Sequence, residues 1–169
     1  MMIPVQRNFL ELKDLKNLKT NSINKNKYLV KKIKPDFQLN KFFYKQVGKK
    51  HRWIDRLSWT DEKWMNYISN KNLETYIICE SEELVGFFEL LYNPELQETE
   101  ISYFGLLEEY IGKGIGGYAL SEAIRKSFEK NIRRVWLHTC TLDHPNALKN
   151  YIARGMTVFK KENINILES

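Results

Sequence analysis

The sequence predicts a mixed α/β domain of the α+β kind, and three observations carry this prediction. Segments rich in β-branched and aromatic residues alternate with segments whose apolar residues recur at three- and four-residue spacing. Three of the extended segments follow one another with short turns between them, which favours an antiparallel meander. A run of glycines within Ile111–Gly117 then joins the last of these three strands to a helix.

The length and composition indicate the class of protein. The 169 residues suffice for one domain, and a domain near this size hides about two-thirds of its unfolded surface. The two cysteines, Cys79 and Cys140, have neither disulfide nor zinc spacing, so we expect reduced, buried thiols. No secretory signal or membrane span is visible, and we expect a cytoplasmic protein without a membrane partner.

The net charge of +6 can steer anionic ligands toward the protein. Lysines are frequent up to Lys34, but no aromatic residue interleaves them between Lys13 and Lys27, as stacking on nucleic-acid bases would require. We therefore expect a solvated lysine-rich surface and no nucleic-acid partner.

The N-terminal part, residues 1–26, is polar, and we expect an extension that packs on a domain of residues 27–169. A short helix is expected in it, with the alternative that this helix binds a partner. Its apolar face would consist of four leucines, Leu10, Leu12, Leu15 and Leu18.

The first strand of the domain is predicted at Lys27–Lys34, where apolar residues stand among lysines. Pro35 and Asp36 stop this strand and begin a helix that ends near Gly48. A second helix begins near Thr60, whose hydroxyl can accept a hydrogen bond from the first turn. Between the helices lie Trp53, Trp59 and Trp64, which either belong to the core or line a substrate site.

The remaining elements follow the same spacing rules. The three strands in series are predicted at residues 75–79, 84–91 and 98–106, and the helix after the glycines runs to Lys130. A strand over residues 133–139 comes next. Two further elements complete the chain, a helix over residues 143–155 with Pro145 early in it and Gly155 at its end, and a last strand over residues 157–166.

Four of the 8 glycines lie in the run Ile111–Gly117. The first turn of a helix carries backbone N–H groups without internal partners, at the positive end of the helix dipole. Glycines permit positive φ angles and close approach of a ligand, so these N–H groups can converge on a phosphate. The simpler alternative is a change of chain direction, but a turn needs only one or two glycines.

Two other phosphate-binding motifs fit this run poorly. A P-loop needs Gly-Lys followed by Ser or Thr, whereas Lys113 is followed by Gly114. A dinucleotide-binding loop has another glycine spacing and lies near the start of its fold.

The run resembles the pyrophosphate loop of the GNAT (GCN5-related N-acetyltransferase) superfamily. That loop has Gln or Arg, two residues, Gly, one residue, and then Gly or Ala. Gly114 and Gly116 occupy the two glycine positions, and Ile111 departs from the pattern at the polar position. The order of predicted elements over residues 27–166 is similar to the same fold. The resemblance implies a mostly antiparallel, twisted sheet that splays apart at the cofactor site, with acetyl-CoA as co-substrate and no metal.

The resemblance also implies which residues bind the cofactor. Loop backbone would hold the pyrophosphate, and the end of the preceding strand would hold the pantetheine arm and polarise the thioester. The residues concerned are Phe104, Gly105, Leu106, Gly112, Lys113, Gly114, Ile115, Gly116 and Gly117.

A second segment resembles the family helix that carries an Asn, and then a Tyr ahead of a Gly-aromatic pair. Asn146 would bond the pantetheine arm, and Tyr151 would lie near the thioester sulfur. Tyr151 suits the protonation of the leaving thiolate, because its hydroxyl stays neutral near pH 7. Met156 stands where the family has an aromatic residue.

The general base remains open between two glutamates and water. Glu100 matches the position of a catalytic glutamate in some relatives, and strict alternation would put it on one strand face with Phe104 and Leu106. Glu89 lies in an apolar run, where burial would raise the pKa of its carboxyl and suit it to accept a proton. We place Glu100 first.

Residues 138–144 contain the residue types of a thiol nucleophile or a metal site, with His138 and Cys140 on one strand face and His144 nearby. No standard zinc spacing is present, and a catalytic thiolate needs an electropositive, partly open environment. We expect these residues to pack or to line the site.

The sequence therefore predicts an N-acetyltransferase that transfers directly from acetyl-CoA to an amine. The acceptor, a small molecule or a peptide, is not identified by the sequence. One alternative is a non-catalytic acyl-CoA sensor of the same fold. Another is a basic nucleic-acid module, which only the net charge supports. The resemblance leaves a homodimer open.

Overall fold

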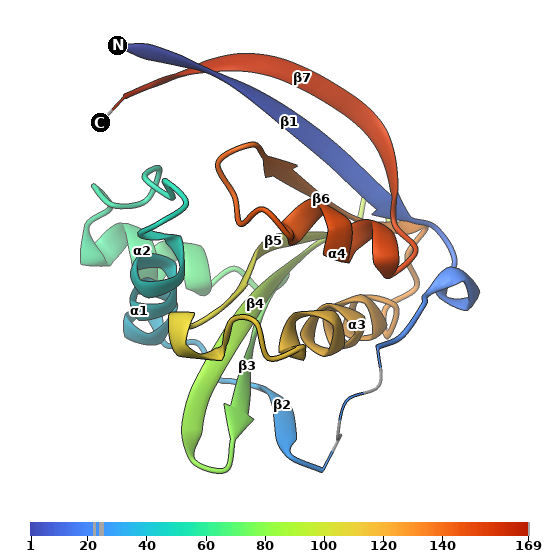
Figure 1. Cartoon of the computed structure of the whole chain (residues 1–169). Helices are drawn as coiled ribbons and strands as arrows, with labels where there is room; N and C mark the ends of the chain where they lie inside the picture. Colours follow the sequence, from blue (N-terminus) through green and yellow to red (C-terminus); the bar gives the residue numbers. More distant parts are fainter. Residues whose placement is uncertain (22, 24–25, 169) are drawn as a thin grey trace.

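The structure, a computed structural model, describes residues 1–21, 23 and 26–168 (Figure 1). The strands are β1 (Met2–Leu12), β2 (Tyr28–Lys32), β3 (Leu73–Glu80), β4 (Glu83–Asn93), β5 (Glu98–Leu106), β6 (Arg134–Cys140) and β7 (Thr157–Leu167). The α-helices are α1 (Phe37–Gly48), α2 (Asp61–Ile68), α3 (Ile115–Ser127) and α4 (Ala147–Ala153). Within this described part, no helix has the length and apolar character needed to cross a membrane.

All described strands belong to one sheet, in the order β2-β3-β4-β5-β6-β1-β7. Neighbouring strands are antiparallel except β5 and β6, which are parallel. The mixed fold and the meander of β3, β4 and β5 are thus confirmed.

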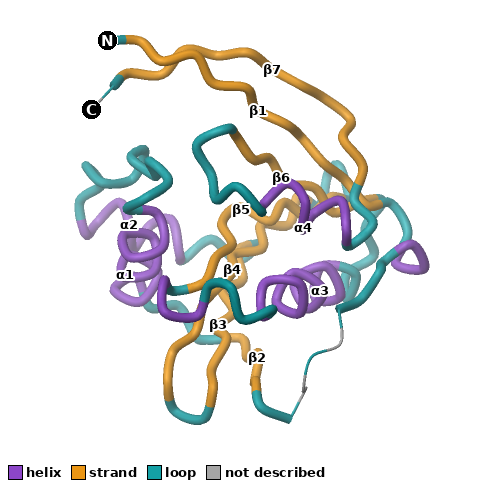
Figure 2. The backbone as a smooth tube through the Cα atoms, viewed as in Figure 1, coloured by secondary structure: helices purple, strands orange, loops and turns teal. Residues whose placement is uncertain are grey.

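Helices cover both faces of the sheet (Figures 1 and 2). Phe87 stacks on Phe43 of α1, with 4.9 Å between ring centroids. The next residue, Phe88, points to the opposite face and stacks on Tyr76, over which Lys126 of α3 lies. We call the two sides the α1 face, covered by α1 and α2, and the α3 face, covered by α3 and α4.

Helix ends follow the predicted signals. Asp36 caps α1 by accepting from the backbone N–H groups of Gln38 and Leu39, and Thr60 caps α2 by accepting from that of Lys63. Gly155 has φ 101° just after α4, a conformation that glycine adopts without strain.

The N-terminal helix prediction is wrong, because β1 is a strand between β6 and β7, antiparallel to both (Figure 1). Leu10 and Leu12 lie two residues apart and are both buried, which is the period of a strand. Leu15 instead begins a short 3-10 helix, Leu15–Asn17. Met2–Leu12 is therefore an interior strand of the sheet.

The predicted orientation of Glu100 is wrong, because a β-bulge at Ser102 puts Glu100 and Phe104 on opposite faces of the sheet. Glu89 pairs with Tyr103, and Leu90 pairs with Ile101, so Ser102 is the extra residue on β5. Paired residues point to the same face, and Glu89 lies on the α1 face with Phe87. Glu100, paired with Leu91, therefore lies on the α1 face, whereas Phe104, paired with Phe88, lies on the α3 face.

Candidate active site

The glycine loop forms an open turn ahead of α3. Gly112 has φ 82°, and Gly114, the residue that caps α3, has φ 77°. A Cβ on either glycine would meet nothing within 4 Å, so the positive φ angles and not crowding call for glycine here. The exposed turn thus leads directly into the positive end of a 13-residue helix, whose first N–H groups have no partners within the helix.

Helix α4 lies directly beside the first turn of α3. A Cβ on Gly116 would be 3.5 Å from Nδ2 of Asn150, and a Cβ on Gly117 would collide with the guanidinium of Arg154. Here glycine permits close packing of side chains from another helix. Asn150 and Arg154 were not singled out from the sequence, where only their position before Gly155 could have indicated them.

Arg154 carries an uncompensated positive charge at this place. Its Nε is buried without a hydrogen-bond partner, and no acidic side chain of the described residues forms an ion pair with it. Partial burial lowers the pKa of Arg154, because a charge loses hydration there without gaining a counter-ion. An anion beside Gly117 would supply both the missing acceptor and the missing charge.

The sheet splits between β5 and β6. These strands pair only from Glu98–Glu100 to Arg134–Trp136, and beyond Glu100 strand β5 pairs with β4 alone. Phe104, Gly105 and Leu106 lie on this split edge, between the last β5–β6 pair and the glycine loop. Backbone N–H and C=O groups on such an edge are free to bond an extended ligand.

Tyr151 reaches the split from α4. Its ring centroid is 6.5 Å from that of Phe104, and the side chain is 8% exposed. Burial, together with the negative charge of Asp143, raises the pKa of Tyr151. The hydroxyl therefore stays protonated at neutral pH and can donate its proton. Asn146 lies exposed just before α4, and its side chain caps no backbone N–H.

The carboxylate of Glu89 accepts hydrogen bonds from three protein side chains. It accepts from Asn40 Nδ2 at 2.8 Å, from the Tyr67 hydroxyl at 2.7 Å and from Arg56 Nη1 at 3.2 Å. Its side chain is 1% exposed. Three protein donors and the charge of Arg56 hold this buried carboxylate, so Glu89 is less accessible to a substrate than Glu100.

Glu100 has a different environment on the same face. It is half-buried, and no described cation forms an ion pair with it. Burial raises the pKa of Glu100, and the positive charge of Arg56 opposes this shift in part. A carboxylate with a raised pKa and no bound donor suits the acceptance of a proton.

Arg56 is the centre of a buried cluster that the sequence did not reveal. Its guanidinium carbon lies 4.1 Å from the ring centroid of Tyr67 and 4.3 Å from that of Tyr103. Trp59 and Trp64 also flank it, at 4.8 and 5.5 Å. Both tryptophans therefore belong to a packed cluster around Arg56, which fixes the α1–α2 loop against β4. Trp53 packs instead on the ring of Tyr103, at 4.7 Å.

The histidine and cysteine segment has a structural explanation. Asp143 Oδ2 accepts from Thr139 Oγ1 at 2.5 Å and from the Cys140 backbone N–H at 2.9 Å, which fixes the turn after β6. Burial and the charge of Asp143 raise the pKa of the Cys140 thiol, which opposes its use as a nucleophile. Both cysteines are free, and Cys140 is only half-buried. Across the described residues, no group of three potential ligands could hold a metal.

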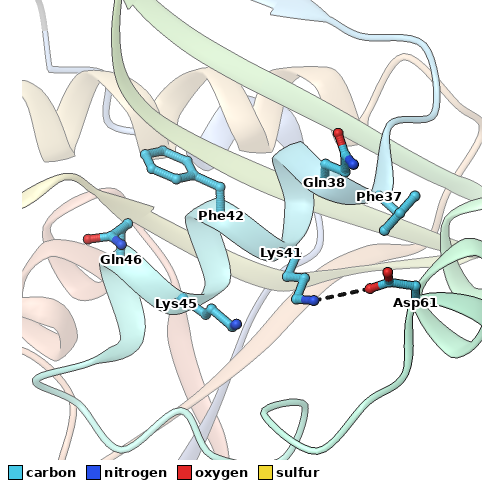
Figure 3. A pocket seen from close by; sticks show the side chains of 7 residues that line it. All are labelled: Phe37, Gln38, Lys41, Phe42, Lys45, Gln46 and Asp61. Carbon is cyan, nitrogen blue, oxygen red and sulfur yellow. Dashed lines mark hydrogen bonds and ion pairs between the residues drawn. The ribbon is translucent and has the colours of Figure 1, made fainter.

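A shallow hollow on the outer side of α1 lies apart from these residues. It measures about 290 Å³, and Lys41 Nζ lies 3.1 Å from Asp61 Oδ1 across it (Figure 3). Its lining consists of Phe37, Gln38, Lys41, Phe42, Lys45, Gln46 and Asp61. It contains no residue of the glycine loop, the split or the Glu100 region.

Comparison with known proteins gives a family and a fold. A family model described as the acetyltransferase (GNAT) family matches residues 35–156. No curated protein is similar enough to the sequence to count as a match.

Several solved structures share the fold. A GCN5-related N-acetyltransferase from Sphaerobacter thermophilus has a TM-score of 0.73 at 16% identity, over 97% of this chain and 52% of that one. A GCN5-related N-acetyltransferase from Kribbella flavida has a TM-score of 0.68 at 14% identity, over 97% and 58%. An aminoglycoside acetyltransferase from an uncultured soil metagenomic sample has a TM-score of 0.63 at 13% identity, over 77% and 88%. The chain thus spans little more than half of the first two structures.

Proposed function

Because the chain belongs to the acetyltransferase (GNAT) family, we propose that it transfers an acetyl group from acetyl-CoA directly to a primary amine. The observation that carries this proposal is one juxtaposition. It combines an open glycine turn at the start of α3, an unpaired Arg154 beside the first turn of α3, and the split between β5 and β6, which Tyr151 reaches from α4. An elongated ligand with phosphates at one end and a thioester at the other suits these features, with the phosphates at the glycine turn and the thioester at the split.

The phosphate end of the ligand binds at the glycine turn. Backbone N–H groups of Gly112–Gly117 converge on the pyrophosphate, and Lys113 adds a positive charge from the exposed side. Asn150 of α4 and Arg154, which follows the end of α4, complete this site. A phosphate here satisfies the buried Nε of Arg154, which otherwise has no acceptor.

The pantetheine arm lies along the split edge of β5. Backbone groups of Phe104, Gly105 and Leu106 bond its amides, as an added strand would. Asn146 contacts the arm from the start of α4. A backbone N–H of this strand end also donates to the thioester carbonyl oxygen as negative charge develops on it.

The reaction exchanges a C–S bond for a C–N bond. The amine nitrogen attacks the thioester carbonyl carbon, and the thiolate leaves with the electrons of the C–S bond. Glu100 accepts the proton that the nitrogen loses, directly or through a water molecule, and Tyr151 gives its proton to the sulfur. Solvent then returns the proton from Glu100 to Tyr151, so that one N–H is replaced by one S–H.

The test is the release of free thiol by the purified protein from acetyl-CoA in the presence of amines. Amine-dependent thiol release supports the proposal. A protein that binds coenzyme A but releases no thiol with any amine would instead be an acyl-CoA sensor.

A further inference from the structure

Aromatic side chains surround Glu100 on the α1 face. Trp136 of β6 is the strand neighbour of Glu100, and Tyr103 follows Glu100 on the same face of β5. Phe9 of β1 lies flat against Trp136, with 6.2 Å between ring centroids and 24° between ring planes. Trp53, from the α1–α2 loop, packs on Tyr103. All four residues are half-buried, so part of each stays exposed.

The acids near Glu100 are neutralised by the protein itself. On β5 and β1, Glu98 and Glu11 both bond Arg134, at 2.8 and 2.7 Å. On β7, Glu162 lies 2.7 Å from Lys160 and 3.9 Å from Arg7.

On β4, Glu89 bonds Arg56. Among the described residues of these strands on the α1 face, Glu100 is therefore the one acid that forms no ion pair. Asp55 is a second acid without an ion pair, and it lies on the exposed α1–α2 loop above Tyr103 and His138.

The acceptor reaches the thioester from the α1 face. The glycine turn and α4 occupy the α3 face, where Tyr151 meets Phe104. The split opens directly after the pair Glu100–Trp136. An amine that enters from the α1 face therefore passes these two side chains before it meets the acyl group.

We propose that the acceptor is a primary arylalkylamine, with its amine at Glu100 and its aromatic ring against Trp136 and Tyr103. This inference rests on the proposed function and names the substrate class of the same site. A ring gains stacking on the exposed aromatic surfaces. The ammonium form is attracted by the charge of Glu100, and it passes one proton to solvent to become the neutral amine that reacts. Polyamines and aminoglycosides carry several cations, whereas Glu100 is the one acid without an ion pair among the described strand residues of this face, with Asp55 on the loop and Asp143 after β6 as further acids without one.

The experiment compares kcat/KM for thiol release with 2-phenylethylamine, hexylamine, spermidine and an aminoglycoside. We expect 2-phenylethylamine to exceed hexylamine by roughly two- to tenfold, the gain that aromatic contacts give, and to exceed both polycations. Trp136→Leu should abolish the advantage over hexylamine while hexylamine itself is still acetylated. Trp136→Phe should restore most of this advantage.

Phe42→Leu is the matched control, because Phe42 is an exposed aromatic residue on the outer side of α1. It should leave the ratio of the two amines unchanged, and thermal melting verifies that each variant is folded. Faster turnover of a polycation, or an unchanged amine ratio in Trp136→Leu, would overturn the inference and leave acetyl transfer intact. If no amine releases thiol, the proposed function fails, and this inference fails with it.

Discussion

The guanidinium of Arg154, the C-cap residue of α4, occupies the space that a Cβ on Gly117 would take in the first turn of α3. This contact links the two segments that the sequence connects with the cofactor, although 36 residues separate them. It also brings a positive side chain without an ion-pair partner to the positive end of a helix. Such an arrangement is costly without an anion and favourable with one.

We predict that Arg154→Gln weakens the binding of coenzyme A by about tenfold or more, the worth of a hydrogen bond to a charged group. Titration calorimetry measures this dissociation constant. Lys45→Gln on α1 is a matched loss of one positive charge away from the glycine turn, and it should have little effect. Equal affinity in Arg154→Gln and the wild type would remove Arg154 from the phosphate site.

Tyr151→Phe should reduce kcat by about a hundredfold or more, as the loss of a general acid does. The dissociation constant of acetyl-CoA should hardly change, because the ring still packs near Phe104. Single-turnover kinetics and equilibrium binding measure the two quantities separately. Unchanged turnover would show that the thiolate is protonated by another group.

The pH profile should report Glu100. Burial raises the pKa of Glu100 despite the opposing charge of Arg56 and with a contribution from Glu89. A base must be deprotonated, so kcat/KM should fall as the pH decreases through this raised pKa, above the usual range of a glutamate. Two other ionisable side chains lie on this face, Asp55 on the facing loop and His138 on β6, so the variant below is needed to assign the limb. Glu100→Gln should remove this acid limb, and a limb that persists would assign the base elsewhere.

The same shift has a consequence for stability. A carboxyl whose pKa is higher in the folded than in the unfolded protein contributes stability at low pH, below its unfolded pKa. That contribution is lost as the pH rises through the folded pKa. Relative to Glu100→Gln, the wild type should therefore lose stability as the pH rises from the unfolded to the folded pKa of Glu100. Chemical denaturation at several pH values measures this difference.

Glu89→Gln should destabilise the fold by about 3–5 kcal/mol, because it leaves the buried charge of Arg56 uncompensated. Denaturant unfolding measures this change. The double variant Glu89→Leu with Arg56→Met should recover part of it, since neither charge then remains buried although Asn40 and Tyr67 lose an acceptor. Any Glu89→Gln protein that folds should keep the acid limb of the pH profile. Loss of that limb would instead make Glu89 the proton acceptor.

Local signals predicted most of the fold. Alternation and helical spacing gave the strands β2 to β7 and the four helices, because each of these patterns follows from which residues are buried. The sequence also predicted the helix starts at Asp36 and Thr60, because capping involves only neighbouring residues.

Long-range contacts decided the rest. The leucines near the N-terminus fit a strand or a helix, and pairing with β6, more than 120 residues away, selects the strand. The bulge at Ser102 inserts one residue and turns Glu100 to the α1 face without changing the composition of β5. The burial of Arg56 against Glu89 likewise depends on a contact between distant segments.

The central claim is that bare backbone at the start of α3 binds the diphosphate of acetyl-CoA. A crystal structure of the protein with coenzyme A tests it most directly. We expect the diphosphate on the N–H groups of Gly112–Gly117, with Arg154 in contact with a phosphate oxygen and the pantetheine arm in the split beside β5. A coenzyme A molecule bound elsewhere, with the glycine turn closed by side chains, would contradict it.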